Sequence, residues 1–239
     1  MNQILRPAIA MIELIFAIVV MGLALMSVPM LISTATKSGY VAIQQEAVAE
    51  AASNMNIIMG YHWDEQDTSD SAPATVLLVS SLGHIDLNES SAGYRVGTPL
   101  ESTRSYFDHM GSRFTATAKA SLGSETGDRD DIDDFNGNSH LIEIIGSTVD
   151  NIETDTIQIS TKVAYILDTP TGSNYNNTVV NGTITFNPDF NADTTSTNIK
   201  RITTTLTSVG APAELSKKIV LHAFSCNVGI SEIESITIP

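Results

Sequence analysis

A long apolar stretch near the N-terminus, residues 9–32, constrains this chain more than any other feature. It runs for 24 residues, and its only polar side chains are Glu13 and Ser27. As an α-helix it would be roughly 36 Å long, enough to cross the hydrocarbon core of a bilayer. The one basic residue before it, Arg6, favours an N-terminus in the cytoplasm and the remainder of the chain outside. The sequence therefore predicts a single-pass membrane protein with an external C-terminal part.

Three interpretations of this stretch compete. It is a secretory signal peptide with a small-residue cleavage site at 33–35, a plain membrane anchor, or an anchor that also serves as an assembly helix. Glu13 separates them, because a carboxylate at the centre of a bilayer costs about 2.5–3.5 kcal/mol and the first two have no use for one. We expect a partner for it, such as an ammonium group on a neighbouring chain. The alternative is an acid that snorkels to the membrane edge.

The helix is expected to continue beyond the membrane. Residues 41–59 carry apolar side chains at near-helical spacing, with good or fair helix formers between them. These apolar positions are Val41, Val48, Ala51, Met55 and Ile58. Pro29 is expected to kink or loosen the helix, Gly39 to add a second soft point and Gly60 to end it. Because this second half is only amphipathic, we expect it to lie on the C-terminal domain.

The rest of the chain, residues 61–239, has the composition of a β-rich domain. It is rich in Thr, Ser, Asn, Asp and Gly, which favour strands and turns. Predicted strands cover residues 75–80, 157–167, 178–186, 198–208 and 218–226. Residues 104–119 are compatible with either a short helix or a strand. Turn-rich segments between the strands favour an antiparallel sheet, so the expected class is α+β, with the long helix packed on the sheet.

Charge and motifs argue against several functions. The net charge of −15 makes nucleic acid an unfavourable partner, because phosphate binding needs a basic surface. Motifs of nucleotide-binding proteins, serine hydrolases and zinc proteases are missing, so no enzymatic activity is expected. Cys226 is the single cysteine and has no intrachain disulfide partner. His222 lies four residues away, roughly 13 Å along a strand, so we expect a half-buried thiol and no catalytic pair.

The segment 8–14 resembles the class III signal of type IV prepilins. In that family a glycine and a phenylalanine precede a glutamate and a long apolar helix; here Ala8 takes the glycine position and Ile9 the phenylalanine position, with Glu13 as the glutamate. Pro29 falls near a proline common in such helices. The resemblance implies that prepilin peptidase cleaves between Ala8 and Ile9, leaving residues 1–8 as a leader and 9–60 as the transmembrane and assembly helix. Glu13 would then face the new N-terminal amine of a neighbouring subunit.

A second segment, 130–137, is similar to an acidic motif of minor pilins, notably those of mannose-sensitive haemagglutinin pili. Residues 200–203 and 218–227 resemble the strands that follow it. The resemblance implies a pilin-like roll and a structural subunit, held first in the inner membrane, that primes, caps or modifies a filament of other pilins. A type II secretion pseudopilin is the closest alternative. A membrane-tethered adhesin or sensor that never polymerises is an alternative of another class.

The acidic stretch also raises the question of a cation. Asp131, Asp133 and Asp134 form a candidate calcium site, but an EF-hand does not fit, because Ile132 occupies the position that should open the loop. We expect Ile132 and Phe135 to anchor the stretch to the sheet and the aspartates to point into water, as a solvated connector. No cofactor is expected, and calcium remains a conditional addition. Short glycosylation sequons contain Asn88, Asn176 and Asn181.

Overall fold

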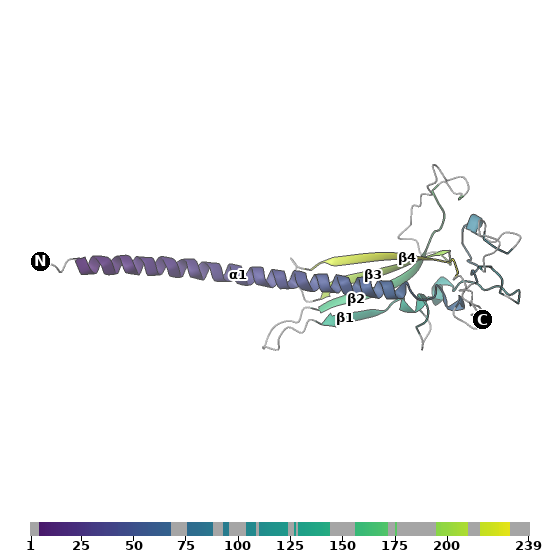
Figure 1. Cartoon of the computed structure of the whole chain (residues 1–239), viewed down its shortest axis with the longest axis horizontal. Coiled ribbons are helices and arrows are strands. Elements are labelled where there is room, and N and C mark those ends of the chain that lie inside the picture. The colour runs from purple at the N-terminus through teal and green to yellow at the C-terminus, as the bar shows by residue number, and fades with distance from the viewer. Residues whose placement is uncertain are drawn as a thin grey trace, which may run out of the picture.

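The computed structural model joins one long helix to a four-stranded antiparallel sheet, so the chain is α+β (Figure 1). The elements are α1 (Leu5–Ile58), β1 (Ser139–Glu143), β2 (Thr156–Ile166), β3 (Ile199–Val209) and β4 (Lys218–Cys226), with the short 3-10 helices η1 (Glu65–Asp67), η2 (Ile85–Leu87), η3 (Lys119–Ser121) and η4 (Asp133–Phe135). The structure describes residues 5–67, 76–87, 93–95, 104–108, 110–123, 127, 129–143, 156–171, 175, 195–209 and 216–229.

α1 is a continuous rod whose N-terminal half projects away from the sheet (Figure 1). Its 54 residues span roughly 81 Å. It passes through Pro29 and Gly39 without interruption, and Figure 1 shows no sharp bend, so the expected kink is wrong. A proline removes one backbone hydrogen bond, and the long helix on either side of it continues without a break. The helix starts four residues before the expected position and ends at Ile58, just before Gly60.

The four strands follow one another in sequence order, and each neighbouring pair is antiparallel. The strands predicted at 157–167, 198–208 and 218–226 are confirmed within one residue at either end, as β2, β3 and β4. β1 is not predicted by the sequence, because it directly follows the acidic stretch assigned to a loop. The strand predicted at 178–186 lies outside the described residues.

Residues 75–80, also predicted to form a strand, make isolated bridges instead. Val76 is bridged to Ser105, and Val79 is bridged to Thr115. The partners of both bridges, Ser105 and Thr115, belong to the ambiguous segment 104–119. The described residues of this segment are not helical before η3 begins at Lys119.

The C-terminal half of α1 lies along one face of the sheet (Figure 1). Its buried residues are Tyr40, Ala47, Ala51, Met55 and Ile58. We call the side of α1 that packs on the sheet the seam. The prediction for the seam is right for Ala51, Met55 and Ile58, which are buried. It is wrong at the start, because Val41 is 48 % exposed and Val48 is only half-buried. Tyr40 begins the seam instead, and its hydroxyl lies 2.6 Å from Ser208 Oγ on β3.

Two alanines let the helix approach the sheet closely. Ala47 and Ala51 contact a cluster formed by Ile157, Ile159 and Leu206 on the two central strands. Ile159 and Leu206 are register partners, so their side chains lie on the same face of the sheet. Each fully buried aliphatic side chain of this size contributes about 1.5–3 kcal/mol relative to exposure. The seam therefore fixes the helix on the domain.

A second apolar cluster lies around the C-terminal end of α1 and includes Met55 and Ile58. Ile132 is fully buried and Phe135 is 7 % exposed, and both pack with Trp63, Tyr165 and Ile202. The expectation that Ile132 and Phe135 anchor the acidic stretch to the sheet is therefore confirmed. Two aspartates of the stretch, Asp131 and Asp133, are buried, in contrast to the prediction that they point into water.

We predict that residues 36–239 form a soluble, monomeric domain with both helix and strand signals in circular dichroism. The removed residues are the exposed apolar part of α1, and the first buried helical side chain is Tyr40. Within this fragment, Ile58→Ala should lower the free energy of unfolding by about 2–5 kcal/mol, because Ile58 is fully buried.

The adjacent Ile57 is the matched control, because it is 56 % exposed. Ile57→Ala should change the stability by less than about 0.5 kcal/mol. Urea denaturation followed by circular dichroism measures both. Equal losses for the two variants, or an aggregated or all-helical fragment, would contradict the packing.

Candidate functional site

The N-terminal half of α1 exposes apolar side chains on every side. Between Met11 and Ile32 the large hydrophobic residues are 50–81 % exposed. Within the described part of the chain, α1 is the one helix long and apolar enough to cross a membrane, with a mean hydropathy of 2.6 in its most apolar window. A helix that is apolar all round needs a membrane or other helices around it. This surface is the first candidate functional site.

Glu13 is the one acidic residue in this half of the helix, and it is exposed. It lies four residues, or roughly 6 Å along the axis, beyond Ile9. Ala8 and Ile9 lie in the first turns of α1, and their side chains are outside the described part of the chain. Glu13 therefore sits on the surface that must meet a membrane or neighbouring helices, whereas processing at Ala8 and Ile9 stays a prediction.

The acidic stretch 130–137 folds inward, which corrects the prediction of outward aspartates in a solvated connector. Asp131 is 1 % exposed and Asp133 is 4 % exposed, while Asp134 is half-buried. The physical reason is Lys200 on β3, which is fully buried and needs carboxylates beside its ammonium group. Attraction to that charge offsets part of the hydration that the aspartates lose on burial, although the loss of hydration remains the larger effect.

Lys200 Nζ makes three short contacts. It donates to Asp133 Oδ1 at 2.5 Å, to Trp63 O at 2.7 Å and to Asp64 Oδ2 at 2.8 Å. The same atom lies 4.2 Å from the centre of the Trp63 ring and 5.4 Å from that of Tyr165. Three acceptors and two aromatic faces hold the amine where water does not reach.

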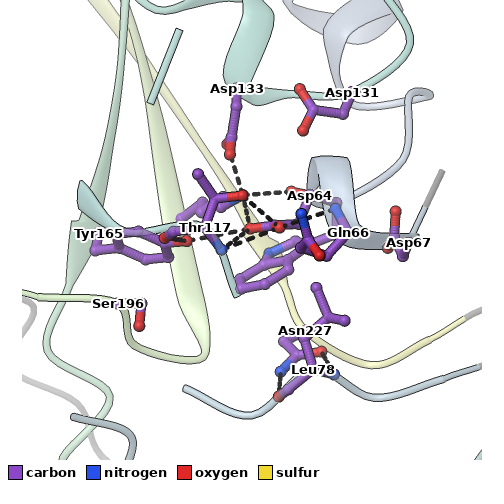
Figure 2. Close-up of polar contacts among 12 residues, drawn as sticks. Asp64, Gln66, Asp67, Leu78, Thr117, Asp131, Asp133, Tyr165, Ser196 and Asn227 are labelled. Carbon is purple, nitrogen blue, oxygen red and sulfur yellow. Dashed lines mark hydrogen bonds and ion pairs between the residues drawn. The ribbon is translucent and has the colours of Figure 1, made fainter. Parts of the chain in front are cut away.

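Asp64 is fully buried as well, although the sequence placed it in a polar loop. Figure 2 shows Gln66, Thr117 and Tyr165 converging on it, with Asp133 pointing toward the same place. Its carboxylate accepts hydrogen bonds from Thr117 Oγ1 at 2.8 Å, Thr117 N at 3.0 Å, Gln66 N at 3.2 Å and the Tyr165 hydroxyl at 3.2 Å. Both of its oxygens are therefore well supplied with donors.

The sequence of β3 contains a signal for the buried cluster around Lys200, whereas the sequence of the loop that contains Asp64 does not. The predicted strand places Ile202 and Leu206 on its inward face, and alternation puts Lys200 on that same face. A lysine at an inward position of a central strand requires a buried acidic partner. The sequence does not reveal which of the many aspartates supplies it.

Burial raises the pKa of three carboxyl groups around Lys200. The pKa of Asp133 rises from its ordinary 3.8 to about 8 and that of Asp131 to about 7, although attraction to Lys200 opposes both shifts. Burial likewise raises the pKa of Asp67 to about 6, opposed by His62, whose Nδ1 lies 3.4 Å from Asp67 Oδ1. One ammonium group does not compensate so many desolvated carboxylates. The cluster therefore retains protons near neutral pH.

The candidate calcium ligands Asp131, Asp133 and Asp134 each accept a hydrogen bond from a different donor. Asp133 Oδ1 accepts from Lys200, Asp131 Oδ1 accepts the Asp134 N–H at 3.0 Å, and Asp134 Oδ2 accepts the Asp130 N–H at 3.1 Å. Across the residues that the structure describes, no group of three or more acidic, histidine or cysteine side chains is arranged to hold a metal ion.

A second polar cluster fixes the segment near Leu78 to the end of the sheet. Asn227 pairs with the Leu78 backbone through both amide atoms, with Nδ2 to O at 2.7 Å and N to Oδ1 at 3.2 Å (Figure 2). Arg95 donates to Asn227 O at 2.6 Å and to Asn198 Oδ1 at 3.1 Å. Asn198 in turn donates to the fully buried Asp168 at 2.7 Å. We interpret this cluster as structural, because its polar groups are hydrogen-bonded to one another.

Cys226 and His222 lie on β4, and both are exposed. The expectation of a half-buried thiol is therefore wrong, because β4 is an edge strand and Cys226 is its last residue. His222 Nδ1 lies 3.2 Å from Thr203 Oγ1.

We predict that the domain loses stability as pH rises from about 5 to about 8. The folded pKa of Asp131, about 7, lies above its ordinary value of 3.8, so the folded state binds more protons in this range. That stabilisation is fully present below pH 3.8 and is lost as pH rises through the folded pKa. In wild type, deprotonation of Asp131 should lower the free energy of unfolding by an amount on the order of a few kcal/mol as pH rises. In Asp131→Asn this decrease should be absent, because asparagine is neutral at every pH.

The melting temperature of residues 36–239 at a series of pH values measures this slope. Glu46→Gln is the matched control, because Glu46 is an exposed acid on α1, and it should leave the slope unchanged. A wild-type domain as stable at pH 8 as at pH 5 would overturn the expectation.

No protein family, curated protein or solved structure matches the chain. Any functional conclusion therefore depends on the projecting apolar helix and on the buried cluster around Lys200.

Proposed function

We propose that this chain is a type IV pilin-like filament subunit. In this role it acts as a minor pilin whose apolar helix packs among the helices of other pilins. Its C-terminal domain, a pilin-like roll, lies at the surface or tip of the fibre. Before assembly the helix holds the subunit in the inner membrane, and prepilin peptidase removes residues 1–8.

The observation that supports the proposal most is the division of α1 into two halves with different surroundings. From Tyr40 to Ile58 one side of the helix is buried against the sheet, whereas residues 10–39 are exposed all round. Because the two halves form one unbroken helix, the orientation of the projecting half fixes that of the domain. A subunit that must be placed in a regular array needs this rigidity, and a simple tether does not.

Glu13 favours assembly over tethering. After cleavage, a neighbouring subunit would present a free amine at its own Ile9. In the low dielectric of a helix bundle, an ammonium and a carboxylate about 4 Å apart attract each other much more strongly than in water. A membrane-tethered adhesin or sensor would gain nothing from the acid. A type II secretion pseudopilin would use the same pairing, so it remains the alternative within the class.

We expect Glu13→Ala to lower incorporation into filaments about tenfold or more, because the amine of the neighbour loses its partner. The external domain should stay folded, since Glu13 is an exposed residue of the N-terminal half of α1, which projects away from the sheet (Figure 1). Immunoblots of sheared filaments against whole cells measure the ratio. Glu46→Ala is the control, because Glu46 is exposed on the packed half of the same helix. Normal incorporation of the Glu13 variant would remove the proposed role.

N-terminal sequencing of the mature protein gives an independent check. The proposal expects a chain that starts at Ile9. A start at residue 36 would instead identify a secretory signal peptide and exclude the assembly helix. An intact Met1 would show that Ala8 is not accepted by the peptidase.

A further inference from the structure

The surroundings of Lys200 have the features of a reactive pair as well as those of an ion pair. Nζ is fully buried, lies 2.5 Å from Asp133 Oδ1 and 2.8 Å from Asp64 Oδ2, and is flanked by the rings of Trp63 and Tyr165. An amine and two carboxyl groups held this close and dry have a very high effective concentration for reaction with one another.

The two carboxyl groups are not equivalent. Asp64 accepts hydrogen bonds from Thr117, Gln66 and Tyr165, which suits a charged carboxylate. Asp133 Oδ2 is buried without a hydrogen-bond partner within the described part of the chain. An unpartnered buried oxygen is costly in an ionised carboxylate, and burial raises the pKa of Asp133 to about 8. Asp133 is thus the protonated, electrophilic member and Asp64 the base.

We propose that Lys200 and Asp133 become joined by an intramolecular isopeptide bond, with Asp64 as the proton acceptor. The Lys200 ammonium first gives one proton to the Asp64 carboxylate. The Nζ lone pair then attacks Cγ of the protonated Asp133 carboxyl and forms the C–N bond. A second Nζ proton moves to the hydroxyl oxygen, the C–O bond breaks, and one water leaves. The products are an amide, a water molecule and a protonated Asp64, so atoms and charge balance without an oxidant or a co-reactant.

The product fits the site better than the reactants do. Reaction removes the buried ammonium charge and one oxygen of Asp133, which has an oxygen without a partner. Before the reaction, Trp63 O and Asp64 Oδ2 both lie within 2.8 Å of Nζ, so an acceptor is at hand for the single N–H of the amide. The bond would join η4 covalently to the central strand β3 across 67 residues of sequence.

Mass spectrometry of the purified full-length chain tests the proposal. The intact protein should be lighter than its sequence by one water molecule after N-terminal processing is taken into account. Digestion with a protease that cleaves after glutamate should yield peptide 126–143 joined to peptide 154–214, again lighter by one water. These two peptides are separated in sequence by residues 144–153, so incomplete cleavage does not produce the same mass. Fragmentation should place the link on Asp133.

Two variants separate the chemistry from the fold. Lys200→Arg keeps a cation but removes the amine nucleophile, so it should show the full sequence mass. Asp64→Asn removes the base, and a variant that is folded by circular dichroism should show the link reduced at least tenfold. A folded wild-type protein with full mass and two separate peptides would overturn the bond. A link through Asp64 or Asp131 would overturn the assignment to Asp133, and full linkage in folded Asp64→Asn would overturn its role as base.

Discussion

The lengths of the helix and the sheet do not match, and much of the structure depends on this mismatch. The central strands have 11 residues each and run for roughly 36 Å, whereas α1 is roughly 81 Å long. The sheet therefore covers only about half of the helix. The uncovered half carries the most apolar residues of the chain, so the folded domain has no means of hiding them from water. A membrane or a bundle of other helices must do so.

Lys200 imposes the second constraint. The fully buried amine of Lys200, near the start of β3, binds Trp63 and Asp64 from the segment after α1, and Asp133 from η4. These segments lie far apart in the sequence, and the described residues between Asp64 and Asp133 form no α-helix and no strand of the sheet. The polar cluster thus organises the part of the domain next to the C-terminal end of α1, where Met55 and Ile58 pack in the same apolar cluster as Trp63 and Tyr165. The apolar anchors Ile132 and Phe135 add to this, but they do not explain why the aspartates beside them turn inward.

The parts of the fold with a periodic pattern could be predicted from the sequence. Alternation located β2, β3 and β4, and the spacing of Ala51, Met55 and Ile58 located the packed side of the helix. Local patterns failed where a distant charge decided the outcome. Asp131 and Asp133 look like solvated turn residues until Lys200 is placed beside them, and Asp64 has no local signal at all. Of the candidate site, Glu13 was evident because a lone acid stands out in an apolar helix.

The orientation of α1 has a mechanical consequence. Figure 1 shows the helix running alongside the strands, so a pull on its projecting half acts along the seam and not across it. In this shear geometry the contacts from Tyr40 to Ile58 bear the load together, whereas a helix lying across the strands would detach one contact at a time. The hydrogen bonds between strands lie at right angles to the load and are not stretched by it. The contact between helix and sheet therefore resists a pull along the helix axis better than a pull directed away from the sheet.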